Sequence, residues 1–181
     1  MNYPLSSLKT NTNFIELNKP AICDIIESTK RIKVFMKKNF SDPFSSLDSV
    51  LNLEKMGKTC DAAIVDVHAE ATSEKMALGN WCDGRVSLVV GTHTHIPTSD
   101  LQMLDKGTVY LTDAGMCGDY NSIIGMDLQE PMQRFVTGMS KGRFTPAKGE
   151  ASLCGVFVQI GHSNLVCRAS KLQVGGRLEV N

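Results

Sequence analysis

Two short apolar runs flank a helix-like segment in the middle of the chain. Residues 62–67 and 86–90 are the apolar runs, and residues 71–81 lie between them with Thr72 or Ser73 as a candidate cap. A strand, a helix and a second strand within this length predict a βαβ unit, whose two strands lie parallel in one sheet with a right-handed crossover. The pattern therefore predicts an α/β protein.

Weaker patterns complete the expected secondary structure. Residues 43–56 carry apolar side chains at near-helical spacing behind Asp42, a candidate helix cap. The other expectations are a third strand at 108–112, an antiparallel hairpin of 153–160 with 165–170, a short strand at 32–36, a helix at 129–139 and irregular structure within 1–30.

Three of the four histidines follow predicted strands directly. His68 ends the first strand of the βαβ unit, and His93 and His95 follow the second. Parallel strands share one carboxyl edge, where open α/β sheets bind their ligands, so these side chains are expected to converge there. Asp113 follows the third strand and is placed to join them. We expect the fourth histidine, His162, to be an ordinary polar residue of the hairpin turn.

The histidine pair has the spacing His-x-His. Residues i and i+2 of extended backbone point to the same side, so His93 and His95 could bind one metal ion or bridge toward two. Neutral imidazole is a good ligand for zinc, iron and manganese. Gly91 would let the backbone turn sharply, and Thr92 and Thr94 can orient their neighbours by hydrogen bonds.

Two carboxylates lie close to His68 in the sequence. Asp66 falls on the same strand face as His68 and could orient or assist the chemistry, although a strand-end Asp satisfied by backbone is an equal alternative. Glu70 and Glu74 precede or begin the following helix, where they suit its dipole; Glu70 is the candidate for a role in the site.

Composition narrows the class of protein. The chain of 181 residues has 19 basic and 19 acidic side chains, a balance that does not favour strong nucleic-acid binding. We expect a single domain over residues 1–181. Its six scattered cysteines suggest free thiols in a reducing compartment, and it has no apolar run of membrane-spanning length. These features predict a soluble cytoplasmic protein without a membrane partner.

Several motifs occur in an order that resembles one bacterial family, the YmdB-like calcineurin-type metallophosphoesterases, which hydrolyse 2′,3′-cyclic-nucleotide phosphodiesters. The motifs are VDVHAEATSEK (65–75), DGRV (83–86), VVGTHTH (89–95), TDAGMCG (112–118) and SIIG (122–125). The resemblance implies a four-layer α/β/β/α sandwich, two divalent metal ions (Mn, Fe, Mg or Zn) and a nucleotide or other phosphodiester substrate.

The resemblance also assigns roles to residues, because it implies that His68, His93 and His95 ligate metal. From their positions in the sequence, we expect Asp66 and Glu70 to assist catalysis, and Asp113, Gly115 and Gly118 to lie near the substrate. The family's remaining ligands are an Asp, a Glu-Asn pair and a further Asn, for which residues 1–60 show no matching motif. We therefore expect a sandwich that is incomplete at the N-terminus, with uncovered sheet surface that favours a homo-oligomer.

Three functions remain open on the sequence. The first is a metal-dependent phosphodiesterase, whole or in part. The second is a non-catalytic regulatory or binding module that retains the fold, and the third is a three-histidine zinc hydrolase of other specificity. The number of metal ions bound per chain distinguishes the first from the second.

Overall fold

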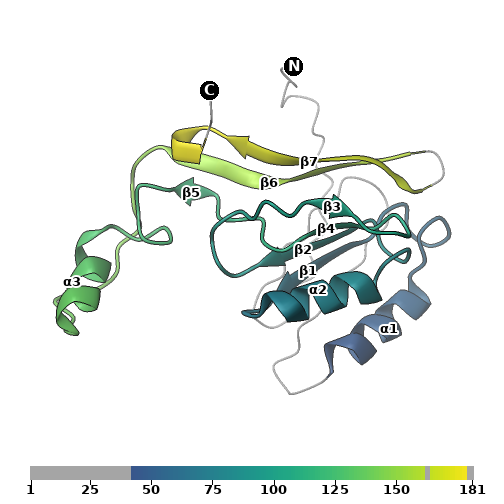
Figure 1. Ribbon diagram of the computed structural model, residues 1–181, viewed down its shortest axis with the longest axis horizontal. Helices are drawn as coiled ribbons and strands as arrows, with labels where there is room; N and C mark the ends of the chain where they lie inside the picture. The colour runs from purple at the N-terminus through teal and green to yellow at the C-terminus, as the bar shows by residue number, and fades with distance from the viewer. Residues whose placement is uncertain (1–41, 162–163, 179–181) are drawn as a thin grey trace.

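The computed structural model of the protein describes residues 42–161 and 164–178. The expectations for residues 1–30 and 32–36, and for His162, lie outside them. Two β-sheets are stacked face to face, and two helices cover the far side of the first sheet (Figure 1). The described part of the chain is thus layered as helices, sheet, sheet.

The first sheet has the strand order β1-β2-β4-β3 and contains the predicted βαβ unit. Strand β1 (Ile64–His68) pairs in parallel with β2 (Leu88–Thr92), which pairs in parallel with β4 (Val109–Leu111). The three strand predictions and their parallel order are confirmed. Strand β3 (Gln102–Met103), which runs antiparallel at the edge, was not predicted, because two exposed residues give no periodic signal.

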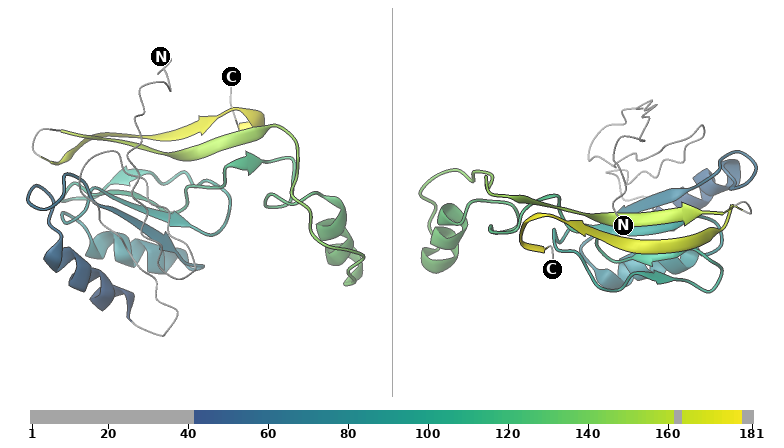
Figure 2. Two further views of the ribbon diagram at one scale, coloured as in Figure 1. Left: turned by 180° about the vertical axis from the view of Figure 1, so that it is seen from behind. Right: turned by 90° about the horizontal axis from the view of Figure 1, so that it is seen from above.

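Helices α1 (Pro43–Leu53) and α2 (Thr72–Trp81) lie side by side against one face of this sheet (Figure 2). The Asp42 side chain caps α1 by accepting from the backbone N–H groups of Phe44 and Ser45, as its sequence position predicts. The predicted cap of α2 is wrong: Ala71 occupies the cap position, and no side chain bonds there.

The second sheet has the order β5-β6-β7. Strands β6 (Ala151–Ile160) and β7 (Val166–Val174) form the predicted antiparallel hairpin, which is longer than expected and is followed by the 3₁₀ turn Gly176–Leu178. The short strand β5 (Gly118–Asp119) pairs with the start of β6 and was not predicted.

Alternation along the strands builds two separate cores. Val65, Val67 and Tyr110 point toward the helices and pack with Leu51 of α1 and Leu78 of α2. The opposite face of the same sheet packs against the hairpin through a second cluster that includes Leu88, Val109, Val156, Val158 and Val166. Because Asp66 and His68 alternate with Val65 and Val67, they emerge on the hairpin side of the sheet.

Helix α3 (Gln129–Thr137) stands away from both sheets at the end of a protruding segment (Figure 1). Its predicted helix is confirmed. Phe135 and Val136 are 81% and 75% exposed. Glu130 braces the segment internally, since its carboxylate accepts from the Arg134 side chain at 2.8 Å, from Ser140 and from the backbone of Lys141.

No helix in residues 42–161 or 164–178 is long and apolar enough to cross a membrane.

Gly91 allows the first core to close. A Cβ added there would overlap the carbonyl oxygen of Thr112, so Gly91→Ala should lower the free energy of unfolding by about 3 kcal/mol. Gly155 lies in β6 with nothing within 4 Å of its Cβ position, so Gly155→Ala should be neutral or stabilise by up to about 1 kcal/mol. Urea denaturation measures the free energy of unfolding of both variants. Equal changes in the two would contradict the close approach of the Thr112 carbonyl to Gly91.

The protruding segment should stay ordered in acid. Hydrogen bonds from Arg134, and then from Ser140, lower the pKa of Glu130 to about 2. The stabilisation from a carboxylate with a lowered pKa is fully present at a pH above the ordinary carboxylate pKa. It is lost only as the pH falls toward the pKa of the folded state, which is about 2 here. Glu130→Gln should therefore speed amide exchange at Lys141 at neutral pH, whereas Glu150→Gln, an exposed acid nearby, should not; unchanged exchange at Lys141 would contradict the bracing role.

Candidate functional site

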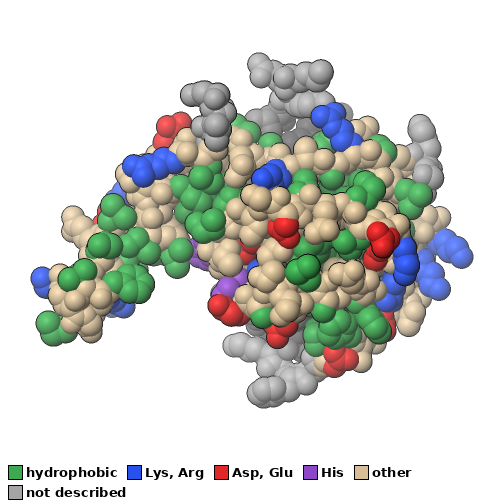
Figure 3. All heavy atoms as spheres, in the orientation of Figure 1, with side chains coloured by type: hydrophobic (Ala, Val, Ile, Leu, Met, Phe, Trp, Pro, Cys, Tyr) green, Lys and Arg blue, Asp and Glu red, His purple; other side chains and the backbone are tan. Residues whose placement is uncertain are grey.

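The ends of β1 and β2 bring polar side chains together at the carboxyl edge of the first sheet. Register pairs His68 with Thr92, one position before His93. Figure 3 shows histidine side chains beside acidic ones in the recess between the α3 segment and the body of the protein. The ends of β1 and β2 thus lie side by side, as predicted, and carry His68 and His93 to the same edge.

His68 is oriented by a row of hydrogen bonds from β1 to β2. The Thr92 hydroxyl donates to Asp66 at 2.9 Å and lies 3.1 Å from Nδ1 of His68. Because its proton is given to Asp66, the hydroxyl accepts from Nδ1–H, and Nε2 of His68 then carries the lone pair. Burial raises the pKa of Asp66, although the Thr92 hydrogen bond and His68 partly offset this.

His93 lies directly against His68. Its Nδ1 is 3.2 Å from Nε2 of His68, and the two rings meet edge to face with centroids 5.0 Å apart. Its other nitrogen, Nε2, contacts the carboxylate of Glu70. Glu70 is 88% exposed and lies in the turn before α2, so its partner in the site is His93 rather than the helix end.

His95 bonds to a different segment from His93. The φ angles are 142° for His93 and 67° for His95, so the extended backbone that the same-side prediction assumed is not present. Nδ1 of His95 donates to the carbonyl of Ile124 at 2.9 Å, which leaves its Nε2 as the unprotonated nitrogen. Positive φ at two non-glycine residues so close together is a costly conformation that clusters at functional sites.

The donors present suit a borderline divalent cation. Imidazoles with an unprotonated Nε2 and a carboxylate are the ligands that zinc, manganese and iron accept. No three His, Cys, Asp or Glu side chains of residues 42–161 and 164–178 converge closely enough to hold a metal ion. His68, His93 and Glu70 are linked in a row by pairwise contacts and do not surround one point, so the described residues fit as part of a ligand set only.

Asp113 is deeply buried beneath this edge. Lys75 of α2 forms an ion pair with it at 3.1 Å, and each side chain is 1% exposed. The carboxylate also accepts from the backbone N–H groups of Thr94 and Gly115. Burial by itself would raise the pKa of Asp113, but these hydrogen bonds and Lys75 lower it below its ordinary value. Asp113 thus stabilises the backbone at Thr94 and Gly115 by accepting hydrogen bonds from their N–H groups.

The loop after Asp113 is held tightly. Gly115 has φ 79°, and a Cβ there would come within 2.9 Å of the Tyr120 hydroxyl. That hydroxyl donates to the carbonyl of His95 at 3.0 Å and accepts from the backbone N–H of Met116 at 3.1 Å. Gly118 begins β5 in an open position. The substrate contacts expected for Gly115 and Gly118 stay predictions.

Sequence reasoning identified Thr92 and Thr94 correctly as orienting residues, but it missed Lys75 and the Ile124 carbonyl. A lysine in a mostly polar helix is usually solvated, so its burial gives no sequence signal. The role of Gly91 also differs from expectation, because it provides room for the Thr112 carbonyl and not a sharp turn.

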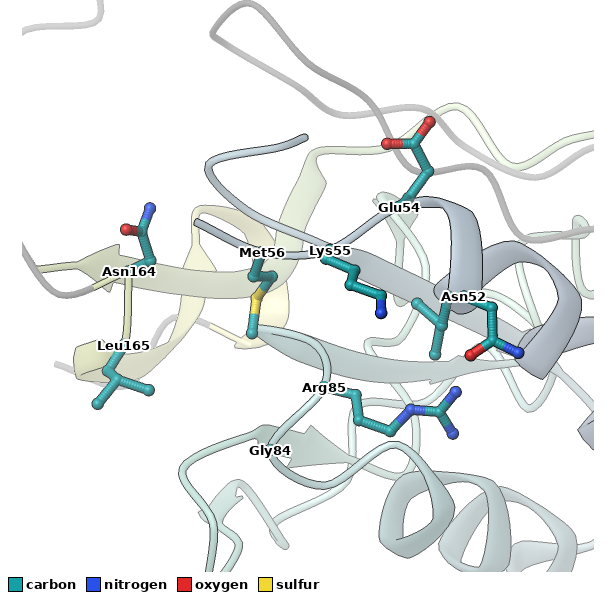
Figure 4. A pocket seen from close by; sticks show the side chains of 9 residues that line it. Asn52, Glu54, Lys55, Met56, Gly84, Arg85, Asn164 and Leu165 are labelled. Carbon is teal, nitrogen blue, oxygen red and sulfur yellow. The ribbon is translucent and has the colours of Figure 1, made fainter. Parts of the chain in front are cut away.

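A cavity of about 410 Å³ lies at the opposite, amino edge of the parallel strands. Lys55, Arg85 and Asn52 line it together with Met56 and Leu51 (Figure 4). Asp48 already pairs with Arg85 at 2.6 Å, and none of the described histidines, His68, His93 and His95, lines the space. The volume of this cavity therefore does not identify it as the chemical site.

Known proteins match most of the chain. The profile of the YmdB-like protein family matches residues 1–172. A 2′,3′-cyclic-nucleotide 2′-phosphodiesterase of Bacillus subtilis is 48% identical over 119 residues, which are 66% of this chain and 44% of that protein. A putative phosphatase/phosphodiesterase of Mycoplasma genitalium is 35% identical over 93% of this chain and 61% of its own length.

Solved structures agree with these matches. A hypothetical protein from Thermus thermophilus superposes with a TM-score of 0.68 at 42% identity over 77% of this chain and 53% of its own. A novel phosphatase from Mycoplasma pneumoniae gives 0.65 at 36% identity over 75% and 47%. The chain spans about half the length of most of these relatives. The family match over residues 1–172, together with these relatives, shows that this protein belongs to the YmdB-like family of phosphodiesterases and phosphatases.

Proposed function

We propose that the chain forms the histidine-bearing side of a dinuclear, metal-dependent phosphodiesterase site that acts on cyclic nucleotides. The observation that carries this proposal is the contact of His68 with His93 and of His93 with Glu70 at the carboxyl edge. The cyclic-nucleotide substrate follows from the name of the Bacillus subtilis relative.

Hydrogen-bond directions support a cation at this contact. The Thr92 hydrogen bond leaves Nε2 of His68 with a lone pair, and this nitrogen faces Nδ1 of His93 at 3.2 Å. The other nitrogen of His93 faces the Glu70 carboxylate, which can orient the ring. A divalent cation bound at this edge would be held by imidazole nitrogens with a carboxylate beside them.

The layering supports a calcineurin-like α/β/β/α sandwich. Helices, first sheet and second sheet are present in the described residues. The outer face of the hairpin exposes Leu153, Phe157, Leu172 and Val174, each between 39% and 48%. A second helical layer packed on this face would complete the sandwich and bury those side chains.

Each residue then has a defined task. When bound, two cations (Mn, Fe, Mg or Zn) polarise the phosphoryl oxygens and lower the pKa of water toward neutrality. His68, His93 and His95 present nitrogen lone pairs, and Asp66 acts through Thr92 to fix the His68 tautomer. Glu70 accepts a hydrogen bond from Nε2–H of His93 and so orients its ring. The loop carrying Gly115 and Gly118 admits the phosphodiester close to the backbone.

One observation favours a second function. Nδ1 of His95 is bonded to the Ile124 carbonyl, and the structure shows no contact of His95 with His68 or His93. A module that binds a single metal ion or nucleotide without turnover would need no third ligand there. The two functions differ in metal stoichiometry, since two ions per chain support the dinuclear phosphodiesterase and one or none supports the binding module.

Metal content and activity test the proposal together. The chain should retain Mn²⁺ after desalting, and His93→Ala should abolish this; Glu70→Gln should weaken it about tenfold, whereas Glu74→Gln, an exposed acid of α2, should not. Turnover of 2′,3′-cyclic AMP should be slow, because no three His, Cys, Asp or Glu side chains of the described residues converge on one point. Equal Mn²⁺ retention by wild type and His93→Ala would sink the proposal.

Thr92 offers a separate test of the tautomer argument. Thr92→Val removes the hydroxyl between Asp66 and His68 at nearly constant volume, and Thr92→Ser keeps it. Mn²⁺ affinity, measured by calorimetry, should fall roughly 10- to 100-fold in Thr92→Val and stay near wild type in Thr92→Ser. The idea fails if both variants bind alike.

A further inference from the structure

We infer that the buried ion pair of Lys75 with Asp113 positions the His93–His95 segment for metal ligation. This inference rests on the proposed function, because it assigns the pair a task toward the imidazoles. Neither residue touches the reacting groups, so both are positioning residues. The inference differs from the expectation that Asp113 contacts substrate.

The pair joins three segments that are far apart in sequence. Lys75 comes from α2, Asp113 follows β4, and Nζ of Lys75 lies 3.1 Å from Oδ2 of Asp113. The same Oδ2 accepts from the backbone N–H of Thr94 at 2.9 Å, while Oδ1 accepts from Gly115 N–H at 3.0 Å. One carboxylate thus holds the middle of the His-x-His segment and the start of the following loop.

Thr94 is where such a hold has most effect. It lies between His93 and His95, both of which have positive φ. Positive φ at non-glycine residues persists only where surrounding contacts over-determine the backbone. The bond from Thr94 N–H to Asp113 supplies such a contact at the centre of the strained segment, and the bond from Met116 N–H to the His95 carbonyl, at 3.0 Å, supplies another at its end.

The position of Lys75 fixes the carboxylate. Its aliphatic stem passes beneath Gly91, where a Cβ would come within 2.8 Å of Lys75 Cδ. An ion pair this deep adds little stability compared with an apolar pair of the same shape. It does fix the orientation of the Asp113 carboxylate, whose oxygens accept from the N–H groups of Thr94 and Gly115. Conversion of both charges to neutral side chains should therefore disturb the histidines more than the fold.

A charge-free double variant separates positioning from stability. Lys75→Met with Asp113→Asn leaves no unpaired buried charge and keeps the side-chain volumes, so it should melt cooperatively. Arg85→Met with Asp48→Asn is the matched control, since it removes an ion pair at the amino edge. Asp113→Asn alone leaves Lys75 without its partner and should be the less stable of the two, so it is compared with the double variant where its own melt is cooperative.

Two readouts are measured on each protein. In the metal-free chain, the imidazole ¹⁵N–¹H signals of His93 and His95 should shift in the double variant and in Asp113→Asn, but not in the control. Mn²⁺ affinity should fall at least about tenfold in the same two variants, as for other residues that orient metal ligands.

The outcomes distinguish the two ideas. Wild-type signals and Mn²⁺ affinity in a folded double variant would overturn the inference. If the wild-type chain binds no Mn²⁺, the proposed function fails, and the imidazole signals still decide: a shift confined to the Lys75 and Asp113 variants supports positioning, and unchanged signals overturn it.

Discussion

Lys75 and Asp113 are both almost completely removed from water, and their contact ties helix α2 to the ends of two parallel strands. Burial of two ions costs several kcal/mol each, so the pair persists only with its remaining hydrogen-bonding capacity used. Asp113 meets this condition through the N–H groups of Thr94 and Gly115. The buried pair also needs a glycine at position 91, because any larger residue there would collide with the Lys75 side chain and with the Thr112 carbonyl.

The histidine edge depends on this buried layer. Parallel pairing of β1 with β2 sets His68 beside Thr92, and the next residue, His93, reaches back to His68 only because its φ is positive. An extended backbone would have sent His93 and His95 to one side together. The positive φ angles on either side of Thr94 are stabilised by the bond from Thr94 N–H to Asp113, so the backbone that carries both imidazoles is held by a buried residue.

Sequence patterns predicted the sheet well and the site in part. Apolar runs located β1, β2 and β4, and the rule that parallel strands share an edge brought His68, His93 and Asp113 to one end. Strands β3 and β5 were not predicted, because a strand of two residues is too short to show an alternating pattern of apolar and polar side chains. The direction of His95 escaped because periodicity assumes regular φ angles, and the burial of Lys75 escaped because a lysine near polar neighbours is typical of a solvated helix face.

The same row of hydrogen bonds links the structure to its chemistry. Asp66 accepts from the Thr92 hydroxyl, this hydroxyl fixes the tautomer of His68, and Nε2 of His68 faces His93, whose other nitrogen contacts Glu70. In the proposed metal site, a cation would use the lone pair that this row of hydrogen bonds leaves on His68. The backbone at Thr94, between His93 and His95, is held by the buried carboxylate of Asp113. The way the two rings face each other therefore depends on a buried group as well as on the residues at the edge.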